Sequence, residues 1–183
     1  SPKSYNSQIG VPLSVWKLAN GFDTAIIEAG ISYPGEMEKL RDIIDPHTGV
    51  ITNIGDAHSE NFRDLETKAS EKLLLFKNCS TIVWCSDNKI IDNLIRTDSA
   101  LNTKKLVDWS ADNDKASLFL EETISKGGIS KLKVKYGEGQ YSFSIPFTDR
   151  GSIENVLTVA AVCLSEGIDV EIIKKGLAGL VSV

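Results

Sequence analysis

Short apolar runs alternate with amphipathic stretches over the first hundred residues, a rhythm that is typical of β-α-β units. Three of the runs are continuous and predict buried strands at residues 23–28, 49–54 and 81–85. Apolar side chains at helical spacing predict helices at residues 36–44, 64–76 and 88–95. Continuous apolar strands are typical of a parallel sheet covered on both faces. The pattern therefore predicts an α/β fold with a mostly parallel sheet flanked by helices.

The pattern changes after about residue 105. Lys131, Lys133 and Lys135 alternate with apolar residues, which indicates a half-exposed strand. Strands are expected at residues 115–123, 129–136 and 140–146, separated by glycine-containing turns. We expect them to form a small antiparallel annex at about residues 112–147, followed by helices at about 153–165 and 170–179.

Composition narrows the class of protein. The 183 residues suit one domain, and 42% hydrophobic with 25% charged residues is ordinary for a globular chain. A net charge of −5 argues against a nucleic-acid partner. No apolar run approaches the roughly 18 residues of a membrane span, and the first residues are polar. Three cysteines without CxxC spacing predict neither a disulfide framework nor a zinc site, so a cytoplasmic protein is expected.

Polar residues follow two of the predicted strands. Glu28 ends the first, and the turn Thr52–His58 follows the second. The carboxyl ends of parallel strands meet at one edge of a sheet, where α/β proteins bind ligands. A Glu and a His at this edge suit a divalent cation that holds phosphate oxygens. The alternative is that both side chains are merely solvated and that the chain is a non-catalytic α/β binding or scaffold module.

Four blocks of the sequence resemble, in the same order and at matching intervals, those of the Mur ligases. They are Asn6–Pro12, Glu28–Gly30 followed by Pro34–Met37, Thr52–His58, and Arg150–Leu157. The resemblance covers nearly the whole chain. It implies the central, ATP-binding domain of this family, whose fold is similar to that of P-loop NTPases.

The resemblance also implies a chemistry. ATP phosphorylates a substrate carboxylate to an acyl phosphate, an amine attacks it, and Mg²⁺ offsets the charge of the transferring group. By matched position, the metal ligands are Glu28, His58 and Lys72. Lys72 stands where the family has a lysine that can be carbamylated, and His58 and Lys72 are the implied catalytic residues. Asn155 and Ser152 are implied at the adenine, and Asn6 on the muramoyl-peptide side of the cleft; these three are the predicted cofactor-binding residues.

Within the family, Pro34–Glu36 and the His58 block are most similar to the branch that adds D-alanyl-D-alanine to UDP-N-acetylmuramoyl-tripeptide in peptidoglycan synthesis. Residues 1–8 look most like the version of this branch that is fused to an alanine racemase. The implied partners are UDP-N-acetylmuramoyl-peptide, D-alanyl-D-alanine and flanking domains of the same polypeptide. The alternatives are a family ligase for a different amino acid, or a folylpolyglutamate ligase.

Two departures from the family pattern matter. Gly151-Ser152 stands where relatives have His-Asn, which leaves Asn155 as the better match for adenine. The phosphate-binding loop G-x-x-G-K-[ST] does not occur in the 183 residues. We therefore expect residues 1–183 to be a partial central domain that lacks the P-loop strand and helix, and that neither hydrolyses ATP nor binds nucleotide tightly by itself. The other explanation is a natural homologue that has lost ATP binding.

Overall fold

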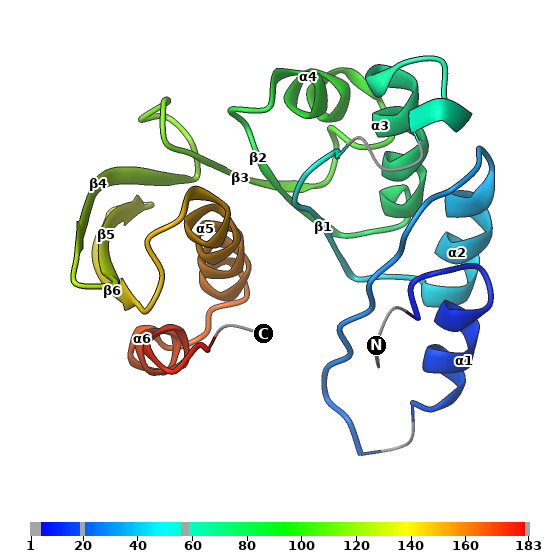
Figure 1. Ribbon diagram of the computed structural model, residues 1–183. Coiled ribbons are helices and arrows are strands. Elements are labelled where there is room, and N and C mark those ends of the chain that lie inside the picture. Colours follow the sequence, from blue (N-terminus) through cyan, green and yellow to red (C-terminus); the bar gives the residue numbers. More distant parts are fainter. Residues whose placement is uncertain (1–4, 19–20, 56–58, 182–183) are drawn as a thin grey trace. The chain divides into compact units, whose positions relative to one another are not determined.

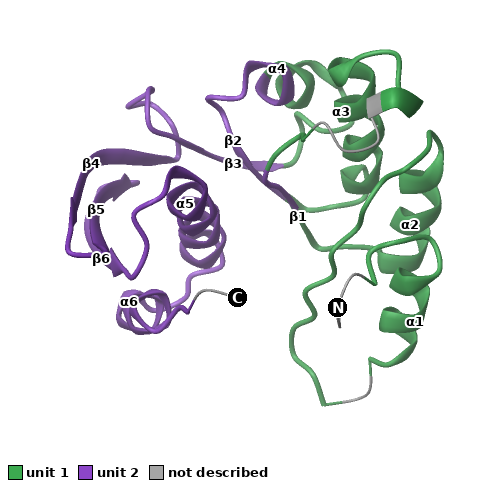
Figure 2. Cartoon of the chain, in the orientation of Figure 1, with its two compact units in different colours: residues 1–49, 53–81, 93–104 green, residues 50–52, 82–92, 105–183 purple. Residues whose placement is uncertain are grey.

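The computed structural model describes residues 5–18, 21–55 and 59–181 (Figure 1). The chain divides into two compact units (Figure 2). The first comprises residues 1–49, 53–81 and 93–104, and the second comprises residues 50–52, 82–92 and 105–183. The first unit is mainly helical, whereas the second holds most of the β-sheet.

The first unit packs its helices around a small apolar core. Its helices are α1 (Gly10–Trp16), α2 (Glu36–Ile44), α3 (Leu65–Leu73) and the 3₁₀ turns η1 (Ser59–Asn61) and η2 (Leu74–Phe76). Helix α2 packs against α1, α3 and η2. One cluster of buried residues in this unit consists of Val11, Ile31, Met37, Leu40 and Phe62.

The ends of α2 and α3 follow from local chemistry. Helix α2 begins after Gly35, whose φ of 82° favours glycine, and Asp45 ends it in the same left-handed region. The Asp64 side chain caps α3 by accepting a hydrogen bond from the Thr67 backbone N–H at 2.7 Å. The predicted helix at residues 36–44 is confirmed, and the one at 64–76 is divided into α3 and η2.

Six strands form one sheet in the order β1-β2-β3-β4-β5-β6. The sheet is mostly parallel with an antiparallel end: β3 pairs with β4 in parallel, whereas β5 is antiparallel to both β4 and β6. The fold class that the sequence predicts, including the antiparallel annex, is confirmed. The strands are β1 (Thr48–Ile51), β2 (Thr81–Cys85), β3 (Lys105–Ser110), β4 (Leu118–Lys126), β5 (Ile129–Tyr136) and β6 (Gly139–Ile145).

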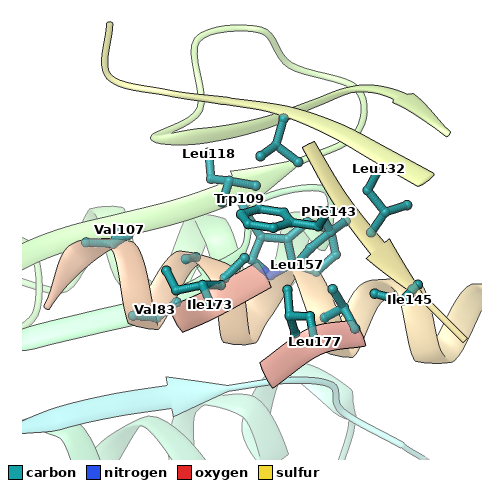
Figure 3. Close-up of a cluster of buried hydrophobic side chains, with 14 residues drawn as sticks. Val83, Val107, Trp109, Leu118, Leu132, Phe143, Ile145, Leu157, Ile173 and Leu177 are labelled. Carbon is teal, nitrogen blue, oxygen red and sulfur yellow. The ribbon is translucent and has the colours of Figure 1, made fainter. Parts of the chain in front are cut away.

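Helices α5 (Arg150–Ser165) and α6 (Val170–Ala178) cover the sheet of the second unit. Figure 3 shows side chains from the strands and from both helices converging in one core, with Trp109, Leu132, Phe143 and Leu157 among them. The Trp109 indole N–H donates to the Thr158 hydroxyl at 2.9 Å, so the buried ring nitrogen has a partner. No helix in the described part of the chain, α4 (Lys89–Thr97) included, is long and apolar enough to cross a membrane.

Besides the division at residues 64–76, other elements differ from the sequence prediction. The strand predicted at 49–54 ends at Ile51, so residues 52–54 are not part of it. Residues 23–28 do not form a strand, and the Ile26 side chain is 85% exposed. A strand requires a hydrogen-bonded neighbour, and the described residues form no ladder with this segment. Helix α1 and strand β3 were not predicted. The buried polar residues Asp108 and Ser110 interrupt the apolar run of β3 and conceal it.

Candidate active site

A polar pocket of about 280 Å³ lies within the first unit. It is formed by the segment before α1, by the loop before α2, by the turn after β1 and by α3. Its lining residues are Asn6, Ser7, Gln8, Gly30, Ile31, Ser32, Glu36, Gly55, Lys68 and Lys72. The sequence predicts two of these, Asn6 and Lys72, as site residues.

Asn6 joins two of the sequence blocks. Its side-chain Nδ2 donates to Oε1 of Glu28 at 2.8 Å, and its backbone carbonyl accepts from the Gly30 N–H at 2.7 Å. A Cβ atom at Gly30 would lie 3.3 Å from Cγ of Asn6, so this close approach suits glycine. The Glu28 side chain is exposed, and within the described part of the chain its Oε2 accepts no hydrogen bond. Asn6 thus orients the Glu28 carboxylate.

Two further carboxylates fix the loop before α2. Glu36 Oε2 accepts from the backbone N–H groups of Ser32 at 2.6 Å and Tyr33 at 3.0 Å. Glu71 on α3 accepts from the Gly35 N–H at 2.9 Å. Both carboxylates hold backbone N–H groups of this loop and so shape the pocket wall.

Helix α3 presents Lys68 and Lys72 to the pocket. The two residues are four apart and therefore lie on the same side of the helix. Lys68 is only 2% exposed, and its Nζ donates to the Gly55 carbonyl at 2.6 Å. Burial, and then the neighbouring charge of Lys68, lower the pKa of Lys72 below its usual value of 10.5. This shift enlarges the neutral amine fraction of Lys72, which is the nucleophilic form.

The predicted metal ligands are only partly within the described residues. His58 lies outside them, so the structure describes Glu28 and Lys72 of the predicted three. Residues 5–18, 21–55 and 59–181 contain no group of three or more His, Cys, Asp or Glu side chains placed to hold a metal. The Glu28 carboxylate is a hard oxygen donor that fits Mg²⁺, whereas an unmodified Lys72 amine does not. The donor chemistry therefore fits Mg²⁺ if Lys72 carries a carbamate.

The predicted adenine residues belong to the second unit. Asn155 is exposed on α5, and Ser152 lies in the first turn of the same helix. The Ser152 backbone N–H donates to Oδ1 of Asp149 at 2.8 Å, so the cap of α5 already uses this amide. The structure thus brings Asn6, Glu28 and Lys72 together in the first unit and places Asn155 and Ser152 in the second.

Several pocket residues were not predicted. Gln8, which donates to the Glu36 carbonyl at 3.2 Å, and Lys68 are two of them. Glu71, which holds the Gly35 N–H beside the pocket, was not predicted either. One signal for Lys68 was present in the sequence, because it lies four residues before Lys72 and next to the apolar stripe of the helix. Gln8 and Glu71 gave no such signal, since they act on backbone groups from distant segments.

The fold and the pocket define an α/β domain with a polar site beside a capped helix. Residues 1–163 match the model of the Mur ligase middle domain, and the chain belongs to this family, whose members are ATP-dependent amide ligases.

The chain is similar to the UDP-N-acetylmuramoyl-tripeptide–D-alanyl-D-alanine ligase of Buchnera aphidicola. The two are 29% identical over 178 residues, which cover 97% of this chain and 38% of the relative. A crystal structure of MurF from Acinetobacter baumannii has a TM-score of 0.86 at 20% identity, over 98% of this chain and 39% of that chain. MurF from Thermotoga maritima in complex with ADP has a TM-score of 0.84 at 20% identity, over 100% of this chain and 42% of that chain. The chain thus spans less than half the length of these proteins.

Proposed function

We propose that the polypeptide containing this chain is an ATP-dependent ligase that adds D-alanyl-D-alanine to UDP-N-acetylmuramoyl-tripeptide. The sequence blocks support this assignment, as do relatives with this activity in their names, among them a Borreliella burgdorferi protein that is 31% identical. The observation that carries the proposal is the hydrogen bond from Asn6 to Glu28 beside a pocket lined by Lys72. A carboxylate, an amide and an amine of lowered pKa thus lie in the first unit.

The proposed reaction passes through an acyl phosphate. The substrate carboxylate attacks the γ-phosphorus of ATP and ADP leaves, after which the D-alanyl-D-alanine amine attacks the acyl carbon and phosphate leaves. Bound Mg²⁺ would supply positive charge that offsets the phosphoryl and carboxylate oxygens. Glu28, His58 and carbamylated Lys72 would hold it. Asn6 orients Glu28, and Asn155, with Ser152 as the weaker candidate, binds the adenine.

Carbamylation of Lys72 belongs to the same proposal. The neutral amine forms a bond to the carbon of CO₂ and releases a proton, which leaves an anionic oxygen ligand on the lysine. We expect the activity of the full-length ligase to rise with bicarbonate, and a mass increment on the peptide containing Lys72 that acid removes. Activity that does not change with bicarbonate would count against the carbamate.

The substrate assignment is tested with the full-length parent protein. We expect UDP-N-acetylmuramoyl-tripeptide and D-alanyl-D-alanine together to release ADP and to give the pentapeptide product. Single amino acids and glutamate serve as competing acceptors. Product with one of these and none with D-alanyl-D-alanine would reassign the protein to another ligase of the family. Absence of ADP release with every acceptor would favour a non-catalytic module.

The separate chain of residues 1–183 is proposed to be inactive. It contains no G-x-x-G-K-[ST] loop, whose backbone N–H groups and lysine hold nucleotide phosphates. We expect no ATP hydrolysis, and titration calorimetry should detect at most weak nucleotide binding. An ATP affinity in the range of roughly 1 µM, equivalent to about 8 kcal/mol, would contradict this proposal.

A racemase domain in the parent polypeptide is a further prediction. It depends on the resemblance of residues 1–8 to racemase-fused ligases, and the names of the relatives reported above mention the ligase alone. The sequence of the parent gene on both sides of this segment decides it.

A further inference from the structure

Lys68 is the most deeply buried charged side chain in the described part of the pocket wall. Its exposed fraction is 2%, and its Nζ lies 2.6 Å from the carbonyl oxygen of Gly55. An ammonium withdrawn from water to this extent is costly unless it makes strong hydrogen bonds. A charge-assisted bond to a carbonyl is among the stronger ones available.

The bond joins a turn to a helix. Gly55 belongs to the irregular turn that follows β1, whereas Lys68 lies on α3, thirteen residues later. Residues 53–55 have no regular secondary structure of their own. The position of this turn therefore depends on side chains that reach it from neighbouring elements, and Lys68 is such a side chain.

We propose that Lys68 is a positioning residue for the ligase reaction. Its buried ammonium binds the Gly55 carbonyl and so holds the turn at residues 53–55 against α3, the helix that carries Lys72. Lys68 does not touch the reacting atoms in this account. It acts through the geometry of the pocket wall, where Gly55, Lys68 and Lys72 all lie. The catalytic half of the inference rests on the proposed ligase function, while the anchoring half does not.

Lys68→Met in the full-length parent protein tests the proposal, because methionine fills a similar volume and cannot donate a hydrogen bond. Lys39→Met, at an exposed position on α2, is the matched control. Hydrogen exchange read by mass spectrometry reports on the anchor directly. We expect faster exchange in the peptide spanning residues 53–55 of the Lys68 variant and no change in the control.

Steady-state kinetics of the same variants report on catalysis. We expect kcat to fall at least tenfold and the apparent Mg²⁺ requirement to rise in Lys68→Met, while KM for D-alanyl-D-alanine stays within twofold. A loss of stability alone would not raise the Mg²⁺ requirement. Unchanged exchange at residues 53–55, or faster exchange with unchanged kcat and Mg²⁺ requirement, would overturn the proposal.

A second variant covers the case in which Lys68→Met does not fold. Lys68→Gln keeps a donor and loses the charge, and it should show smaller changes of the same sign in exchange and in kcat. An exchange rate and a kcat equal to those of the unmodified protein would again overturn the proposal. If the unmodified parent shows no ligase activity, the proposed function fails, and the exchange measurement still decides whether Lys68 anchors the turn.

Discussion

The side-chain amide of Asn6 donates a 2.8 Å hydrogen bond to the carboxylate of Glu28, which lies 22 positions later in the sequence. The same residue accepts a hydrogen bond from the Gly30 N–H through its backbone carbonyl. Asn6 therefore constrains both the side chain and the backbone of the segment that carries Glu28. A carboxylate held in this way needs little reorganisation when a cation binds.

This pair predicts unequal effects of two substitutions in the full-length ligase. Glu28→Gln removes the charge, so kcat should fall by about 10²–10³, the usual loss for a group that stabilises transition-state charge. Asn6→Ala leaves the charge and removes its orientation, so a loss of about 10–100-fold is expected. Glu138→Gln, in an exposed hairpin turn of the second unit, is the control and should retain activity. Full activity of Glu28→Gln would show that this carboxylate is not in the site.

Lys72 predicts opposite effects on activity and on stability. Lys72→Met should abolish ligase activity. It should also raise the free energy of unfolding of this chain at neutral pH, because burial and Lys68 disfavour the Lys72 ammonium. Stability is measured by urea unfolding in CO₂-free buffer.

The sign of the pH dependence follows from the lowered pKa. Between the folded pKa of Lys72 and its unfolded value of 10.5, the unfolded state binds more protons, so stability of the unsubstituted chain gains from this group as pH rises. The advantage of Lys72→Met should therefore be largest at neutral pH and shrink as pH approaches 10.5. A variant that is less stable at neutral pH would contradict this account.

The extent of successful prediction from sequence differs between elements for physical reasons. The helix at residues 36–44 and the strand at 81–85 were predicted with their observed bounds, because one has apolar side chains at helical spacing and the other is a continuous apolar run. Residues 23–28 have a similar run, but a strand also depends on a neighbour that the run itself does not reveal. The periodicity of one segment does not show whether a neighbouring strand is present to pair with it.

In the candidate site, too, some residues were predicted from the sequence and others were missed. Asn6, Glu28 and Lys72 were selected from blocks that resemble a family, and the structure places them within one unit. The partners that orient the pocket were missed, because their bonds are to backbone groups. Lys68 bonds to a carbonyl, and Glu71 bonds to an N–H, so neither contact leaves a paired residue type in the sequence.

The cap of α3 predicts an acid-dependent change in stability. Hydrogen bonds from Thr67 lower the pKa of Asp64 below its usual value of 3.8. The ionised Asp64 carboxylate therefore stabilises the folded chain above pH 3.8, and this stabilisation is lost as pH falls through the folded pKa. Asp64→Asn keeps a capping oxygen without the charge. We expect this variant to match the unsubstituted chain near neutral pH and to lose less stability on acidification. Parallel pH profiles below pH 4 would contradict the assignment.

Strand β5 provides a matched pair of core and surface substitutions. Leu132 is fully buried in the core of the second unit, and Leu132→Ala should lower the free energy of unfolding by about 2–5 kcal/mol. Ile129 on the same strand is 50% exposed, and Ile129→Ala should change it by roughly 0.5 kcal/mol. Urea unfolding of the separate chain measures both. Equal effects would show that Leu132 does not pack as described.

The proposed acyl phosphate is tested by following the oxygen atoms of the substrate. UDP-N-acetylmuramoyl-tripeptide labelled with ¹⁸O in its terminal carboxylate is incubated with ATP, D-alanyl-D-alanine and the full-length protein, and the released phosphate is weighed by mass spectrometry. An acyl phosphate transfers one carboxylate oxygen to phosphate, so the account predicts one ¹⁸O per phosphate released with product, and strongly reduced release in Glu28→Gln. Unlabelled phosphate accompanying amide product would contradict it.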